Sequence, residues 1–202
     1  TFIDPRDGEI YNLVQIGNQI WMAEDLRYAN ATNAQIPWTQ QTDDGSYVYH
    51  PSFLGNGIDW DTNTWVGGTL APDGWRVATD LDWQVLENEV GMSNEATNQF
   101  CVRLSGDVGL KLKNTSFGGN DTYGFNVKGF NSGNDFKVYM VNYGSVNGGG
   151  ITGIIRSFDI NSDGNLRSYS YESNCNFSDF YTNYPNSSNY IGPTGAGGGY
   201  HV

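Results

Sequence analysis

Two short runs of β-prone residues form the clearest strand pattern of the chain, at residues 11–16 and 19–22. Gly17 and Asn18 separate the runs. A two-residue connection of this kind favours a primed β-turn, because its twist matches the twist of paired strands. The pattern therefore predicts a β-hairpin over residues 11–22.

A helical pattern occupies residues 79–91. Thr79 and Asp82 match a capping box, in which a hydroxyl and an acid three residues later satisfy the first backbone N–H groups. Three apolar residues then follow at helical spacing: Trp83, Leu86 and Val90. Gly91 stands where a left-handed residue ends a helix. We interpret Asp80 and Asp82 as acids of the positive helix start rather than as catalytic groups.

Further β-prone runs follow from about residue 100, separated by Gly and Asn clusters. These runs cover residues 100–104, 125–130, 136–143, 151–160 and 167–171. Residues 28–70 show no strong periodicity of hydrophobic residues, and we interpret them as long ordered loops with short strands. The pattern predicts a single domain over residues 1–202 that combines β-strands, one clear helix and long ordered loops.

Composition and charge narrow the functional classes. The chain has 202 residues, which suit one domain, and 22 acids against 10 bases give a net charge of −12. Nucleic acids and anionic membranes are disfavoured as partners, because no basic stripe is available to replace counterions. No apolar run reaches the ~20 residues of a membrane span. Because Thr1 is not an initiator Met, we expect a processed protein that is extracellular or at the cell surface.

The opening segment TFIDPRDGEIYNLVQIGNQIWMAEDLRY resembles the start of the Fibrobacter succinogenes major paralogous domain. The family pattern is T-F-x-D-x-R-D-G-x-x-Y, followed by I-G-x-Q-x-W-M-A-E-N-L. The matching residues are Asp4, Arg6, Asp7, Gly8, Tyr11, Ile16, Gly17, Gln19, Trp21, Met22, Ala23, Glu24 and Leu26. Asp25 stands where the family usually has Asn.

Two later segments extend the resemblance to about residue 130. APDGWRVATDLDWQVLENEVG resembles the family's C-P-x-G-W-H-L-P-x-x-x-E-W-x-x-L, with Ala71 in place of the usual Cys. The matches in that segment are Pro72, Gly74, Trp75, Trp83 and Leu86. LKLKNTS with NDTYGFNV resembles the family's T-K-L-K-S with G-x-D-x-Y-G-F. The family's W-S-S-T-E block and V-R-C-V end are absent, so we expect a diverged C-terminal third.

The helix segment also resembles the R-L-P-T-E-A-E-W-E element of sulfatase-modifying-factor-like domains, which have a C-type-lectin-like fold. The resemblance therefore implies a C-type-lectin-like fold, which is an α+β domain with short antiparallel sheets, one or two helices and long irregular loops. It also implies a secreted or surface-attached protein.

The chain has two cysteines, Cys101 and Cys175. An even count in an exported protein favours a disulfide. The bond would close a loop of about 75 residues, worth roughly 4 kcal/mol if unstrained. Two alternatives stay open at this point: free buried thiols, and a reactive thiol pair such as an oxidase of the related fold would use.

The segment Asp159-Ile160-Asn161-Ser162-Asp163-Gly164-Asn165 matches the start of a calcium loop. The side-chain oxygens of Asp159, Asn161, Asp163 and Asn165 would converge on Ca²⁺. Ser170 occupies the position where a bidentate acid is expected. The alternative interpretation is a hairpin turn, since turns favour the same residue types.

Several further residues are candidates for binding or modification. Trp38, Trp60 and Trp65 lie among Asn, Asp and Gly residues and could stack on sugar rings. Five Asn-x-Ser/Thr sequons mark candidate glycosylation sites, at Asn30, Asn114, Asn120, Asn176 and Asn186. No G-x-S-x-G, phosphate-loop, H-E-x-x-H or dinucleotide fingerprint is present in the sequence, so catalysis is poorly supported.

Three functions are compatible with these features. The first is a non-catalytic adhesion or binding protein whose partner is an extracellular glycan or protein. The second is a self-assembling subunit of an extracellular filament or surface layer. In that case the Gly-rich residues 192–202 would act as an assembly strand rather than a flexible tail. The third is an enzyme related to formylglycine-generating oxidases, which would need Cys101 and Cys175 as thiols.

Overall fold

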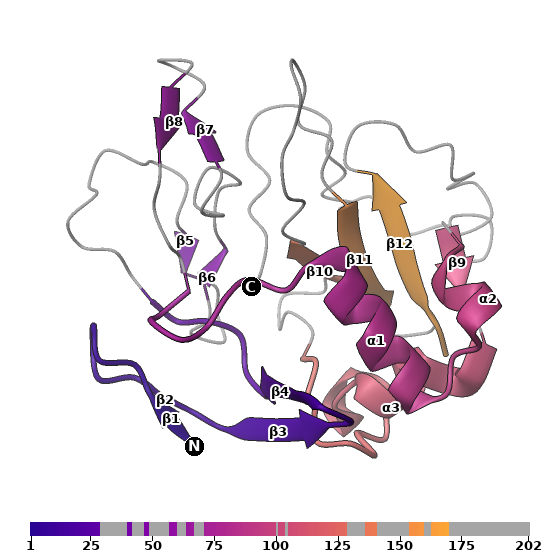
Figure 1. The fold of residues 1–202 in the computed structure, drawn as a ribbon. Helices are drawn as coiled ribbons and strands as arrows, with labels where there is room; N and C mark the ends of the chain where they lie inside the picture. Colours follow the sequence, from indigo (N-terminus) through magenta and orange to yellow (C-terminus); the bar gives the residue numbers. More distant parts are fainter. Residues whose placement is uncertain are drawn as a thin grey trace.

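Short antiparallel strand pairs and short helices make up the described part of the chain (Figure 1). The computed structural model describes residues 1–28, 40–41, 47–48, 57–59, 64–66, 71–99, 101–103, 105–128, 136–140, 154–159 and 163–169. This arrangement confirms the predicted α+β class with short antiparallel sheets. None of the helices in these ranges is long and apolar enough to cross a membrane.

Two strand pairs form the N-terminal part. Strands β1 (Phe2–Ile3) and β2 (Ile10–Tyr11) pair with each other, and β3 (Leu13–Ile16) pairs with β4 (Gln19–Met22). The β3–β4 hairpin confirms the predicted turn at Gly17, whose φ of +57° suits a residue without Cβ. The predicted first strand was too long, because Tyr11 belongs to β2 and the chain leaves that pair before Leu13.

Helix α1 (Asp80–Val90) confirms the helical prediction and its boundaries. The Thr79 hydroxyl accepts from the Asp82 backbone N–H, and the Asp82 carboxylate accepts from the Thr79 backbone N–H in return. Gly91 ends the helix with a φ of +119°. Two shorter α-helices follow, α2 (Asn94–Thr97) and α3 (Val108–Leu112), together with the 3₁₀ turns η2 (Ser105–Asp107) and η3 (Thr115–Phe117). The described residues thus hold more helices than the one or two predicted.

A four-stranded antiparallel sheet lies behind α1 in the view of Figure 1. Its strands are β9 (Cys101–Arg103), β10 (Phe136–Met140), β11 (Ile154–Asp159) and β12 (Asn165–Tyr169), in the order β10-β11-β12-β9. Four shorter strands form two further pairs: β5 (Gln40–Gln41) with β6 (Tyr47–Val48), and β7 (Gly57–Asp59) with β8 (Thr64–Val66).

The predicted strand over residues 125–130 is wrong for the described residues 125–128. Val127 makes only an isolated parallel bridge with Lys113. Asn126 has a φ of +66°, which interrupts an extended backbone. Phe125 and Val127 are nevertheless buried, so their apolar spacing reflects core contacts of an irregular segment rather than a strand.

The larger hydrophobic core lies between α1, the four-stranded sheet and the segments around α3. Its buried members are Ile16, Trp83, Leu86, Val90, Met92, Ala96, Val108, Leu112, Phe117, Phe125, Val127 and Phe158. A smaller cluster of Tyr11, Leu26 and Val77 joins the N-terminal strands to the segment before α1. Both clusters therefore anchor the hairpin β3–β4 and the residues that follow it against the helix start.

Candidate functional site

A pocket of about 380 Å³ opens between the β3–β4 hairpin, the segment at 71–78 and the start of α1. Aromatic, aliphatic and charged side chains share its lining. The lining residues are Asn18, Gln19, Ile20, Trp21, Met22, Glu24, Asp25, Leu26, Ala71, Pro72, Gly74, Trp75, Arg76, Val77, Ala78, Asp82, Trp83, Phe125 and Asn126. A volume of this size is within the range of small-molecule sites.

Aromatic rings form the inner part of the pocket. Trp83 and Phe125 are almost fully buried, and the half-buried Trp21 packs on both, with ring centroids 5.3 Å and 5.5 Å away. The half-buried Trp75 contributes a fourth ring, and it packs on Phe2 at 5.2 Å. These packed rings hold one another in place, so the aromatic surface is preformed rather than assembled on binding.

Gln19 joins the hairpin to the helix start within this wall. Its side-chain Nε2 donates to the Asp82 carbonyl at 3.2 Å, and its Oε1 accepts from the Trp21 indole Nε1 at 3.2 Å. The position of the Trp21 ring is therefore fixed by a hydrogen bond as well as by ring packing.

Glu24 and Asn126 bring two more polar groups to the pocket. Glu24 accepts from the Asn12 side chain at 2.5 Å and from Arg27 Nη1 at 2.5 Å. Partial desolvation opposes ionisation, but these hydrogen bonds outweigh it and lower the pKa of Glu24. Asn126 donates to the Ala23 carbonyl at 3.1 Å. Both side chains are thus held by the protein itself.

An arginine–carboxylate pair lies beside the helix start. Arg76, with 63% of its side chain exposed, donates two hydrogen bonds to Asp82. Asp82 is also the capping acid of α1 and accepts from Thr79. Desolvation is opposed by the hydrogen bonds from Arg76 and Thr79, which together lower the pKa of Asp82 to about 2. Asp82 is therefore a permanent carboxylate at neutral pH.

The lining combines an apolar aromatic surface with carboxylate and amide groups at fixed positions. The described lining residues include no Ser, Thr, Cys, His or Lys.

The comparison with known families bears on this pocket. The sequence model of the Fibrobacter succinogenes major domain matches residues 14–152, more than half of the chain. The chain belongs to this family. The family membership predicted from the sequence motifs is therefore confirmed. No curated protein and no solved structure matches the chain.

The motifs of the Fibrobacter succinogenes major domain converge on the pocket. Residues 19–26, 72–83 and 125–126 are far apart in the sequence, yet all contribute to its lining. The lining residues that match the family patterns are Gln19, Trp21, Met22, Glu24, Leu26, Pro72, Gly74, Trp75, Trp83 and Phe125. Residues that depart from the family pattern line it as well: Asp25, Ala71, Arg76, Val77, Ala78 and Asp82.

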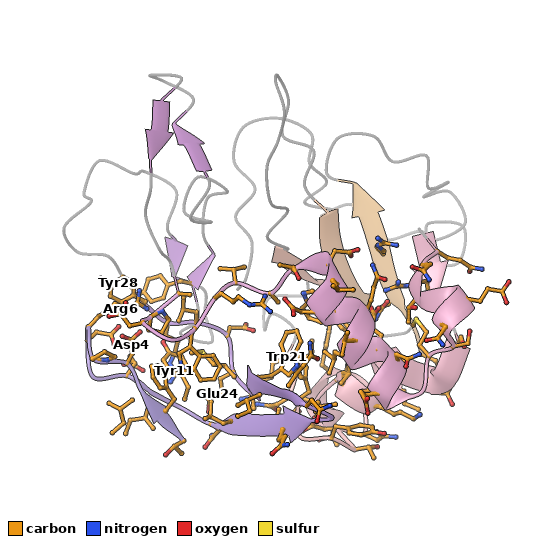
Figure 2. All side chains as sticks on the ribbon, viewed as in Figure 1. Asp4, Arg6, Tyr11, Trp21, Glu24 and Tyr28 are labelled. Carbon is orange, nitrogen blue, oxygen red and sulfur yellow. The ribbon has the colours of Figure 1, made fainter. Side chains whose placement is uncertain are left out.

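The motif ahead of residue 14 has a structural role in this family member (Figure 2). Asp4 is fully buried and accepts from Arg6 Nη2 at 2.6 Å, which lowers the pKa of Asp4. The Arg6 guanidinium lies 3.7 Å from the centroid of the Tyr28 ring. Tyr11 accepts from the Arg27 backbone N–H at 2.8 Å, and burial raises the pKa of Tyr11 to about 12. These contacts fix the chain on either side of the hairpin.

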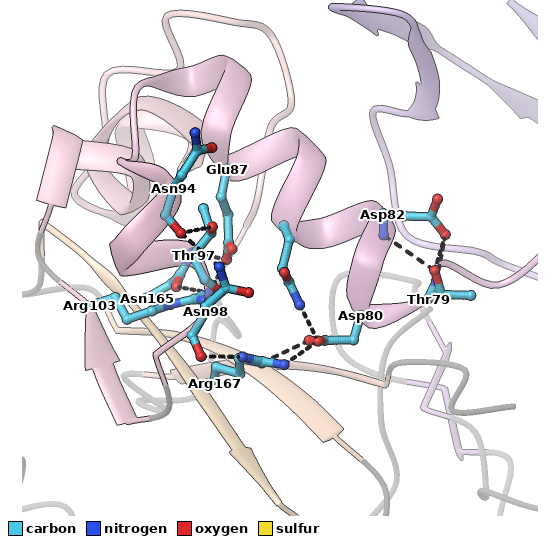
Figure 3. A network of polar contacts seen from close by, with 11 residues as sticks. Thr79, Asp80, Asp82, Glu87, Asn94, Thr97, Asn98, Arg103, Asn165 and Arg167 are labelled. Atoms are coloured by element: carbon cyan, nitrogen blue, oxygen red, sulfur yellow. Dashed lines mark hydrogen bonds and ion pairs between the residues drawn. The ribbon is translucent and has the colours of Figure 1, made fainter.

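Sequence reasoning missed a buried polar network beneath α1 (Figure 3). Arg103 and Glu87 are both fully buried and form an ion pair, and Asn165 bonds to each of them. Asp80 pairs with Arg167, so it is more than the helix-start acid that we predicted. The available signal was the spacing of Asp80 and Glu87, because residues seven apart lie on one helix face.

The three predicted sugar-stacking tryptophans are only partly covered by the structure. Trp38 and Trp60 lie outside the described residues. Trp65 belongs to β8, where it pairs with Ile58 of β7. Their role in ligand binding stays a prediction.

The predicted calcium segment connects β11 to β12, in agreement with the hairpin interpretation. The Asp163 carbonyl accepts from the Leu110 N–H at 3.2 Å, and the Asn165 side chain is directed to Arg103 and Glu87. Asp159 ends β11, and Asn161 lies outside the described residues. Among the residues that the structure describes, no group of three His, Cys, Asp or Glu side chains could hold a metal ion. Calcium binding at this segment stays a prediction.

The predicted disulfide and glycosylation sites are described only in part. Cys101 lies in the edge strand β9, whereas Cys175 is outside the described residues. Asn114 caps η3 and donates to Asn126 at 2.6 Å, and Asn120 is exposed. Three sequons lie outside the described residues: Asn30, Asn176 and Asn186. The disulfide and the use of the sequons stay predictions.

Proposed function

We propose that this chain is an extracellular or cell-surface binding module that holds a sugar residue of a glycan in the pocket between β4 and α1. The observation that carries the proposal is the convergence of three separate motif segments on one aromatic-lined pocket. Gln19, Trp21, Glu24 and Trp75 are motif residues of this lining that are only half-buried, so a ligand can reach them.

The chemistry of the pocket supports a sugar as the ligand. Sugar rings have an apolar face of C–H groups that packs on aromatic rings, and the half-buried Trp21 and Trp75 supply such rings. Sugar hydroxyls donate to carboxylates, and Glu24, Asp25 and Asp82 lie in the same lining. A few fixed polar groups on an aromatic surface are typical of specific small-molecule sites.

Substitution of the half-buried Trp75 tests this function. Trp75→Ala should weaken glycan binding at least about fivefold, since stacked aromatic contacts are worth about 1–3 kcal/mol in comparable ring contacts. Glycan-array screening followed by calorimetric titration, with and without Ca²⁺, measures the effect. Trp75→Phe should retain part of the affinity, which separates a lost stacking surface from a lost fold.

Trp65→Ala tests the alternative site, because Trp65 of β8 is one of the three tryptophans predicted to stack on sugar rings. It should leave binding unchanged if the pocket is the site. If Trp65→Ala lost binding and Trp75→Ala kept it, the binding site would instead lie at the predicted residues Trp38, Trp60 and Trp65. No response from any carbohydrate class would refute the proposed function.

We also propose the C-type-lectin-like fold for the whole domain. Small antiparallel sheets, one three-turn helix packed on a sheet and N-terminal hairpins support this assignment. The two other functions rest on residues outside the described ranges. Residues 192–202 would supply the assembly strand of a filament subunit, and Cys175 would be half of an oxidase thiol pair. Both stay predictions.

A further inference from the structure

We infer that the pocket discriminates ligands by charge, accepting neutral or cationic sugars and rejecting anionic ones such as uronic acids. The inference rests on the proposed function, because it names the class of sugar that the same site takes. It follows from two properties of the lining: its net charge, and the hydrogen-bonding capacity that the protein leaves available.

The charged lining is acidic. Three carboxylates (Glu24, Asp25 and Asp82) face one guanidinium (Arg76), which leaves two negative charges among the lining residues. Arg27 pairs with Glu24, and Glu9 pairs with Arg27. The charges of Arg27 and Glu9 cancel, so the balance stays at two negative charges. An anionic ligand would therefore enter a pocket of its own sign, and like charges repel most strongly where water is partly excluded.

Several N–H groups of the wall are bonded to the protein. The amide of Gln19 donates to the Asp82 carbonyl, the amide of Asn126 donates to the Ala23 carbonyl, and the indole of Trp21 donates to Gln19. Arg76, the cationic donor of the lining, makes a two-bond contact with Asp82. A carboxylate ligand needs such donors, and at these N–H groups it would compete with the acceptors that they already bind.

The carboxylates of the lining are themselves hydrogen-bonded. An ionised carboxylate accepts about four hydrogen bonds. Asp82 accepts two from Arg76 and two from Thr79, and Glu24 accepts three from Asn12 and Arg27. Their negative charge remains, so the lining attracts a ligand ammonium group and repels a ligand carboxylate. The pocket therefore favours a neutral sugar or an amino sugar over a uronic acid.

Asp25 offers a matched substitution. Asp25→Asn keeps the shape of the side chain and removes one negative charge from the lining. Asn18, an exposed lining residue in the hairpin turn, allows the opposite change, and Asn18→Asp adds one charge. Neither residue belongs to the hydrophobic clusters of the fold, so both variants should fold normally.

The experiment compares the methyl β-glycosides of glucose, glucosamine and glucuronic acid at about pH 6, where the amine is protonated and the carboxylate ionised. Shifts of the tryptophan indole N–H resonances give the dissociation constants. Glucuronide should bind at least about fivefold more weakly than glucoside, and glucosaminide at least as tightly as glucoside. Asp25→Asn should lower the ratio of the glucuronide dissociation constant to the glucosaminide dissociation constant by about fivefold. Asn18→Asp should raise this ratio.

Equal or tighter binding of the glucuronide to the unsubstituted protein would overturn the inference and leave the binding function standing. An unchanged ratio in both variants would overturn it as well, because the lining charge would then not set the preference. If none of the three glycosides binds, the inference fails, and the glycan array with Trp75→Ala decides separately on the proposed function.

Discussion

Replacing Glu87 by glutamine should strongly destabilise the protein, although the two side chains have nearly the same shape. The side chains of Glu87 and Arg103 are both 0% exposed, and their ion pair joins α1 to the edge strand β9. Desolvation lowers the pKa of the Arg103 guanidinium, yet an arginine stays protonated at neutral pH. The substitution therefore leaves a buried positive charge without its counter-charge.

The size of the effect follows from that uncompensated charge. Removing one partner of a buried ion pair typically costs about 3–5 kcal/mol. Asn165 keeps its bond to Arg103 at 3.1 Å, and the Thr97 carbonyl accepts from Arg103 at 2.7 Å. These neutral acceptors reduce the penalty toward the lower figure. We therefore expect a loss of about 3 kcal/mol in the free energy of unfolding.

Urea unfolding followed by tryptophan fluorescence and far-ultraviolet circular dichroism measures this loss. With a slope of about 2 kcal/mol per molar urea, the midpoint should fall by roughly 1.5 M. Glu89→Gln is the matched control on the same helix, because Glu89 is exposed and its substitution should cost less than about 0.5 kcal/mol. A Glu87→Gln midpoint within 0.3 M of the control, roughly 0.6 kcal/mol by the same slope, would refute the role assigned to the ion pair.

Two further predictions concern the packing around the pocket. Tyr11→Phe removes the acceptor of the Arg27 N–H and should cost about 1–2 kcal/mol in urea unfolding. Since the pKa of Tyr11 rises from 10.0 to about 12 on folding, stability should fall as the pH rises from about 10 to about 12, and less steeply in Tyr11→Phe. Gly109→Ala should lower the thermal midpoint by several degrees, because its Cβ would clash with the carbonyl of Gly164.

The sequence was sufficient to predict the elements that depend only on neighbouring residues. The hairpin turn at Gly17 and the capping box of Thr79 and Asp82 each depend on a few adjacent positions, and the structure has both where the sequence predicts them. The motif segments likewise identified the family, because a motif is a property of the linear chain. Residues 125–128 show the limit of this reasoning, since their apolar spacing comes from core contacts and not from a strand.

The tertiary structure alone decided which side chains share a site. Nothing in the linear chain places Trp75 in the same lining as Trp21, or Asp80 against Arg167, because these residues come together only in the folded chain. Sequence reasoning therefore interpreted Asp80 as a helix-start acid and looked for ligands among the isolated tryptophans at residues 38–65. Burial changes what a charged or aromatic residue does, and burial is set by partners that are distant in the sequence. The sequence by itself determined the family, the hairpin and the helix, and packing determined the pocket.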